Sequence, residues 1–111
     1  MVIDVKKEEA LGELLKEAEE LLEDIYQGGF TTVSESCEQE LERLRKKADA
    51  YGMEIFSRLL TQFQEQYTAG RHRMQTEQKA CLHAFALVCT YVELARERNA
   101  YDVAAAYYAM E

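Results

Sequence analysis

The pattern of apolar and polar residues is helical along most of the chain. In residues 5–27, apolar side chains recur at steps of three and four, and almost every other position carries Glu, Lys or Asp. The apolar positions are Leu11, Leu14, Leu15, Ala18, Leu21, Leu22 and Ile25. This spacing predicts an amphipathic helix. We expect Gly28-Gly29 to end it, because glycine readily adopts the left-handed conformation found after helices.

Three further segments, residues 34–51, 53–69 and 76–98, show the same periodicity. Two capping boxes compete for the start of the first of these, Thr32 with Glu35 and Ser36 with Gln39. Segment 53–69 is the most aromatic, so we expect it at the centre of the core. Segment 76–98 is apolar nearly all round between residues 80 and 92. That pattern predicts either a central helix or one whose surface meets something outside the chain.

The end of the chain leaves two interpretations open. Asn99 is a poor residue inside a helix and a good cap, so it favours a break followed by a short fifth helix over residues 100–110. The alternative is that the fourth helix continues. Short connections force neighbouring helices to run antiparallel. The predicted fold is therefore all-α, an antiparallel bundle of four to five helices in one domain covering residues 1–111.

Composition supports this fold and narrows the function. The chain has no proline, is 48% apolar and 31% charged, and carries a net charge of −8. Residues 1–27 hold nine acidic and three basic residues, which gives −6 for this stretch alone. An acidic surface repels phosphate backbones, so we expect no nucleic-acid binding. There is neither a signal-like apolar run at the N-terminus nor an 18-residue apolar span, so we expect a cytoplasmic protein that does not enter membranes.

The residues capable of chemistry do not converge. Cys37, Cys81 and Cys89 occupy positions where apolar residues are expected, and their odd number fits no disulfide framework. Neither His72 nor His83 follows a glutamate by three positions, as a di-metal bundle site requires. Cys81, His83 and Cys89 point in different directions on one helix, so they cannot close on one ion. We expect no catalytic residue, no metal site and no cofactor.

Two surface clusters and one internal cluster are candidates for binding. The basic residues Arg43, Arg45, Lys46 and Lys47 either pair with the acidic first helix or form a docking patch for an acidic partner. The tail residues Tyr101, Tyr107, Tyr108 and Met110 either pack on the bundle or form an exposed partner or dimer surface. A cavity between helices is the third possibility, lined by Phe56, Phe63, Cys81, Phe85 and Cys89.

One stretch resembles a known family. Residues 21–30, LLEDIYQGGF, are followed by Leu41, Leu44 and Ala48, by the corner Tyr51-Gly52-Met53, and by Phe56, Leu59, Leu60 and Phe63. This pattern resembles the helical region beside the zinc finger in bacterial proteins of the SWIM type, over residues 10–70. The chain lacks the Cys-x-Cys and Cys-x-His ligands, so no finger is present. The resemblance implies a bacterial accessory helical domain with no catalytic residues.

These observations predict a non-enzymatic helical domain that serves as a protein-interaction or scaffold module. We expect its partner to be another protein or a second copy of the chain. The alternative is a regulatory bundle that binds a small ligand in the predicted cavity.

Overall fold

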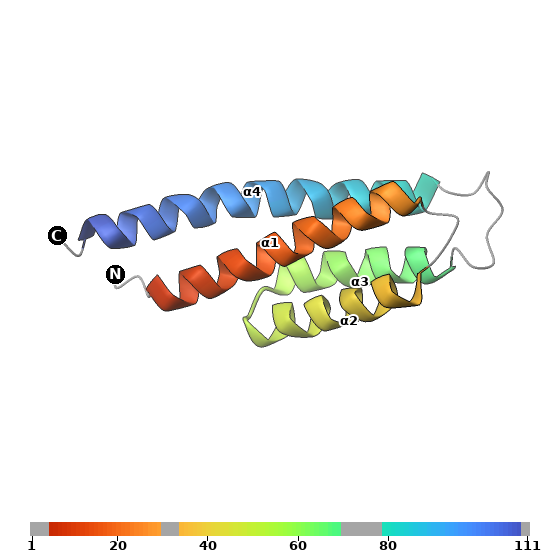
Figure 1. The fold of residues 1–111 in the computed structure, drawn as a ribbon, viewed down its shortest axis with the longest axis horizontal. Coiled ribbons are helices and arrows are strands. Elements are labelled where there is room, and N and C mark those ends of the chain that lie inside the picture. The colour runs from red at the N-terminus through yellow and green to blue at the C-terminus, as the bar shows by residue number, and fades with distance from the viewer. Residues whose placement is uncertain (1–4, 30–33, 70–78, 110–111) are drawn as a thin grey trace.

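The computed structural model describes residues 5–29, 34–69 and 79–109 (Figure 1). Within these ranges the chain forms four helices and no strand: α1 (Val5–Gly28), α2 (Glu35–Ala50), α3 (Glu54–Ala69) and α4 (Lys79–Ala109). Consecutive helices run antiparallel in Figure 1. α1 packs on α2 and α4, and α3 packs on α2 and α4. The predicted all-α antiparallel bundle is confirmed.

Of the two interpretations of residues 99–110, the favoured break near Asn99 is wrong and the alternative is confirmed, because α4 runs without interruption from Lys79 to Ala109. The Asn99 side chain does not compete for its own backbone. Its Nδ2 donates a hydrogen bond to the carbonyl oxygen of Glu8 in α1, at 2.7 Å. A distant partner therefore satisfies the amide that usually disfavours asparagine inside a helix.

The core is formed by the apolar faces of all four helices. α1 buries the stripe from Leu14 to Ile25, as its periodicity predicts. α3 contributes the three largest fully buried side chains, Phe56, Phe63 and Tyr67. The Phe63 ring lies 5.5 Å from the Phe85 ring of α4, centroid to centroid. The most aromatic helix therefore supplies the largest buried side chains of the core.

Local signals set the ends of α2. Ser34 caps its start, and the Ser34 hydroxyl accepts a hydrogen bond from the Cys37 backbone N–H at 3.3 Å. The cap is thus neither Ser36 nor Thr32, the latter lying outside the described residues. At the other end Gly52 has φ of +75°, and the Met53 N–H donates to the Ala48 carbonyl. This is a Schellman motif, which turns the chain sharply into α3.

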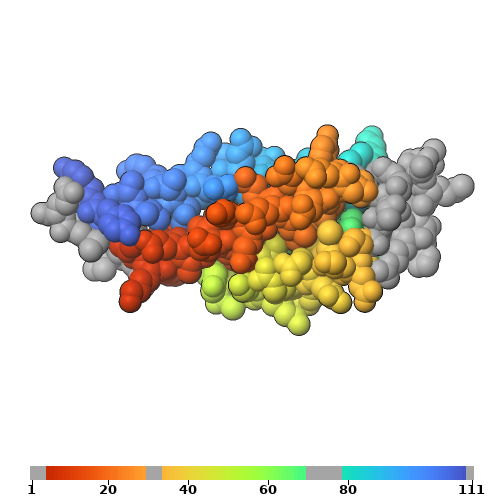
Figure 2. Space-filling model, in the orientation of Figure 1, coloured from red at the N-terminus to blue at the C-terminus, as the bar shows by residue number. Residues whose placement is uncertain are grey.

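The molecule is elongated, with extents of 57 × 20 × 19 Å. α1 and α4 are the longest helices and extend together past the corner between α2 and α3 (Figures 1 and 2). We call this extension, residues 5–12 and 99–109, the arm. Within the arm α1 and α4 approach closely, because a Cβ atom placed on Gly12 would lie 2.6 Å from Asn99 Oδ1. The C-terminal part of α4 thus has α1 as its neighbour in the arm, where it extends past α2 and α3.

Candidate interaction surface

The basic cluster is paired with carboxylates of the same molecule. The Arg43 guanidinium lies 2.9 Å from a Glu40 oxygen and 3.2 Å from a Glu17 oxygen of α1. Lys47 Nζ also lies 3.8 Å from Glu17. These contacts match the first interpretation of the cluster, in which α2 pairs with the acidic α1.

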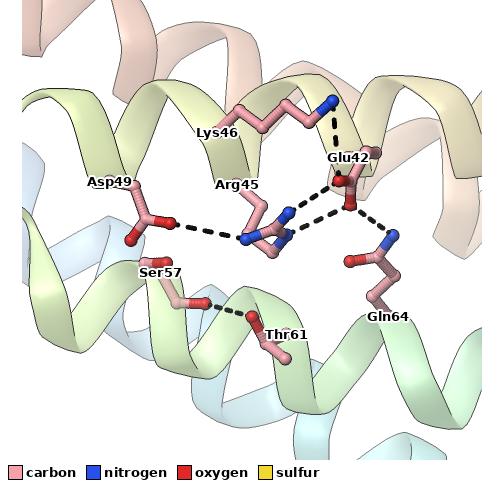
Figure 3. A network of polar contacts seen from close by, with 7 residues as sticks. All are labelled: Glu42, Arg45, Lys46, Asp49, Ser57, Thr61 and Gln64. Carbon is pink, nitrogen blue, oxygen red and sulfur yellow. Dashed lines mark hydrogen bonds and ion pairs between the residues drawn. The ribbon is translucent and has the colours of Figure 1, made fainter.

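The rest of the cluster joins a network on α2 and α3 (Figure 3). Arg45 lies 2.6 Å from Glu42 and 3.4 Å from Asp49, and Lys46 lies 3.9 Å from Glu42. Gln64 of α3 donates to Glu42 at 2.9 Å. The hydrogen bonds from Arg45 and Gln64 lower the pKa of Glu42 from 4.5 to about 2. This local neutralisation leaves little net positive charge for an acidic partner.

The five residues of the predicted cavity lie in two different places. Phe56, Phe63 and Cys81 are fully buried in the packed core. Phe85 and Cys89 instead line an open groove of about 470 Å³ between α1 and α4. The buried Leu22 and Val92 lie at the floor of this groove, the exposed Tyr26 forms part of its wall, and its rim carries Glu19, Glu23 and Glu93. The five residues therefore do not line one common cavity, and two of them line an acid-rimmed surface groove instead.

The groove holds no activated thiol. Burial raises the pKa of Cys89, which lowers the fraction of this thiol that is ionised at neutral pH. Cys81 is buried, Cys37 is half-buried and His83 is exposed, whereas His72 lies outside the described residues. No group of three or more His, Cys, Asp or Glu side chains in the described ranges could hold a metal ion.

The tyrosines of the tail divide into two kinds. The Tyr107 hydroxyl donates a hydrogen bond to Glu9 of α1, so this half-exposed residue contacts the bundle through its hydroxyl. Tyr101 and Tyr108 are 69% and 80% exposed. Met110, the fourth residue of the predicted tail cluster, lies outside the described residues. Both interpretations of the tail therefore apply, each to different tyrosines.

Tyr101 and Tyr108 belong to a longer row of exposed apolar side chains on α4, which was not predicted from the sequence. Leu87, Leu94, Tyr101 and Tyr108 are 41%, 60%, 69% and 80% exposed. They recur every seven residues along the uninterrupted α4, and seven residues make nearly two helical turns. The four side chains consequently lie along one outer face of α4, and we call them the outer stripe.

Ile55 extends this apolar surface onto α3. Its side chain is 63% exposed. The neighbouring Phe56 ring stacks on Tyr91 of α4 with centroids 5.2 Å apart, which places the start of α3 level with the stripe residues Leu87 and Leu94. An apolar surface of this length on one helix is typical of a protein contact.

In the ranges that the structure covers, no helix combines the length and apolarity needed to cross a membrane. Comparison with known proteins adds no assignment: no family model, curated protein or solved structure matches the chain.

Proposed function

We propose that this chain is a non-enzymatic helical interaction domain that binds another helix through the outer stripe of α4. The exposure of four large apolar side chains at heptad spacing carries the proposal. Two helices that pack along a heptad seam place apolar residues at two positions in every seven, and the stripe supplies one of these two positions over its whole length. Complete burial of such a side chain contributes about 1.5–3 kcal/mol, so covering these four partly exposed side chains offsets part of the free-energy cost of association.

The test is site-specific photo-crosslinking with a benzophenone amino acid in the living cell. Placed at position 94 or 101, the probe should give a discrete crosslinked product, identified by mass spectrometry. Leu82, also on α4 and 46% exposed, provides a matched control because it does not follow the seven-residue spacing. Equal products from position 82 and from the stripe, or none from the stripe, would contradict the proposal.

The groove between α1 and α4 favours a second candidate function, binding of a hydrophobic cation. Its aromatic wall is a stacked pair, Tyr26 and Phe85, with centroids 6.2 Å apart. Glu23 and Glu93 on the rim would attract the positive charge, and the aromatic faces would hold it by cation–π interaction. Tetraphenylphosphonium should bind with higher affinity than tetraphenylborate, the isosteric anion. The double variant Glu23→Gln, Glu93→Gln should remove that preference, and equal binding of both ions would exclude this function.

A further inference from the structure

We infer that the helix bound by the outer stripe is α4 of a second copy of this chain, parallel to the first around a two-fold axis. This inference rests on the proposed function and specifies its partner. Three features of the structure support it: the charges beside the stripe, the apolar area available, and the position of Ile55.

The charges beside the stripe differ between its two flanks. Arg98 lines a groove with Met53, so it lies on the flank that faces the α2–α3 corner. Glu93 lines the groove with Leu22 of α1, so it lies on the opposite flank. Glu97 follows Glu93 by four positions and shares that flank. One flank of α4 therefore carries the carboxylates of Glu93 and Glu97, whereas the other carries the ion pair of Arg98 with Asp102.

The symmetry of a helix pair decides which flanks meet. In a parallel two-fold pair, the acidic flank of one α4 faces the Arg98 flank of the other. Arg98 then lies beside Glu93 and Glu97 of the second copy, and symmetry repeats the contact. In an antiparallel pair identical flanks meet, so Glu97 faces Glu97 and Arg98 faces Arg98. Opposite charges attract and like charges repel, which selects the parallel orientation.

Arg98 retains hydrogen-bonding capacity for this contact. Its Nε lies 3.2 Å from Asp102 within α4, and its side chain is 77% exposed. A guanidinium group carries five N–H donors, so Arg98 can keep Asp102 while it binds a carboxylate of the second copy.

The apolar area is consistent with a weak but specific dimer. The exposed parts of Tyr101 and Tyr108 provide roughly 300 Å² per copy. Leu87, Leu94 and Ile55 raise this to roughly 450 Å², or about 900 Å² for two copies. Specific interfaces bury about 1,200–2,000 Å² in total, so flanking polar side chains must supply the remainder. This area predicts a dimer that dissociates on dilution.

The exposed Ile55 indicates that the second helix packs on the side of the stripe that adjoins α3. Tyr91 stacks on Phe56, so the α4 surface near Leu87 and Leu94 adjoins α3. A helix laid on the stripe at this level contacts α3 as well as α4. The exposed Ile55 is then covered by the same packing, which brings both α3 helices against the dimer seam.

Disulfide trapping tests the orientation. In a background with Cys37, Cys81 and Cys89 replaced and the fold verified by circular dichroism, Leu94→Cys and Tyr101→Cys each place one thiol in the stripe itself, which lies on the two-fold seam and on neither flank. A parallel dimer predicts that each variant crosslinks to itself under mild oxidation. Crosslinks formed only when the two variants are mixed indicate an antiparallel dimer and overturn the inference. Leu82→Cys should not crosslink.

Charge exchange tests the contact itself, by sedimentation equilibrium. Glu97→Lys and Arg98→Glu should each raise the dimer Kd about tenfold, because each disrupts two symmetric pairs. The double variant restores opposite charges and should return the Kd towards the wild-type value. Single variants with an unchanged Kd, or a double variant weaker than both, would contradict the pairing.

The failure of this inference differs from the failure of the proposed function. A chain that stays monomeric at high concentration, yet is photo-crosslinked from positions 94 and 101 to another protein, overturns the inference and leaves the proposed function standing. A monomer that gives no stripe-specific product overturns both.

Discussion

The replacement of Gly12 by alanine measures how closely α1 approaches α4 in the arm. On an open helix surface this substitution stabilises a protein by about 1 kcal/mol, through helix propensity alone. Here the new methyl group would lie 2.6 Å from Asn99 Oδ1 and must displace the amide. The displaced amide weakens the hydrogen bond from Asn99 Nδ2 to Glu8, worth about 0.5–1.5 kcal/mol. We therefore expect Gly12→Ala to give no net stabilisation.

A double-mutant cycle separates the two effects. In an Asn99→Ala background the obstacle is gone, so Gly12→Ala should stabilise by about 1 kcal/mol, and the coupling between the sites should reach about 1 kcal/mol. Urea unfolding followed by circular dichroism provides the free energies. Gly28→Ala is the matched control, because nothing lies within 4 Å of its added Cβ. Equal stabilisation by Gly12→Ala in both backgrounds would refute the close approach.

Three further predictions concern the core, the polar network and the thiols. Phe63→Ala should lower the free energy of unfolding by about 3–5 kcal/mol in urea titrations, whereas Leu82→Ala at a half-exposed position should cost under about 1 kcal/mol; similar losses would contradict the assigned core. The pKa of Glu42 is lowered to about 2, so its stabilisation is present above about pH 4.5 and disappears as the pH falls towards 2. The difference in melting temperature between wild type and Glu42→Gln should therefore shrink between pH 6 and pH 2.5. We expect the underlying difference in the free energy of unfolding to stay below about 1 kcal/mol, because the ion pair is near the surface. A difference in melting temperature that does not change with pH would show that the charge of Glu42 is not responsible. Cys81 is fully buried, so a thiol reagent should modify it only on unfolding, and rapid labelling in the native protein would contradict its position.

Apolar periodicity predicted the helices well because it is a local signal that burial enforces. Leu14, Leu15 and Ile25 are buried because a helix of this sequence has only one apolar face to turn inward. The error at Asn99 has the opposite cause. Its hydrogen-bond partner, Glu8, lies 91 residues away in the sequence, so no local pattern indicates that the amide will be satisfied inside a helix.

The outer stripe was visible in the sequence but was divided by that error. The interpretation with a break at Asn99 places Leu87 and Leu94 in a fourth helix and Tyr101 and Tyr108 in a fifth, so their common spacing of seven has no structural meaning in it. Because α4 is continuous, the four residues lie along one face of a single helix, and their spacing of seven defines the outer stripe. For the basic cluster, the density of positive charge on α2 was clear, but the position of Glu17 opposite Arg43 depends on how α1 packs.

The distribution of charge is compatible with a second copy on the outer stripe, despite the net charge of −8. Much of the negative charge is on α1, and α1 contacts α4 through Arg96, which pairs with Glu19. Arg96 follows Leu94 by two positions, so it lies about 200° around the helix from the stripe. A parallel pair of α4 helices therefore places the two α1 helices on opposite outer sides of the dimer. At that separation salt largely screens their repulsion, since the Debye length is about 8 Å at physiological ionic strength. In the dimer that we propose, the short-range attraction between Arg98 and Glu97 of the second copy selects the parallel orientation.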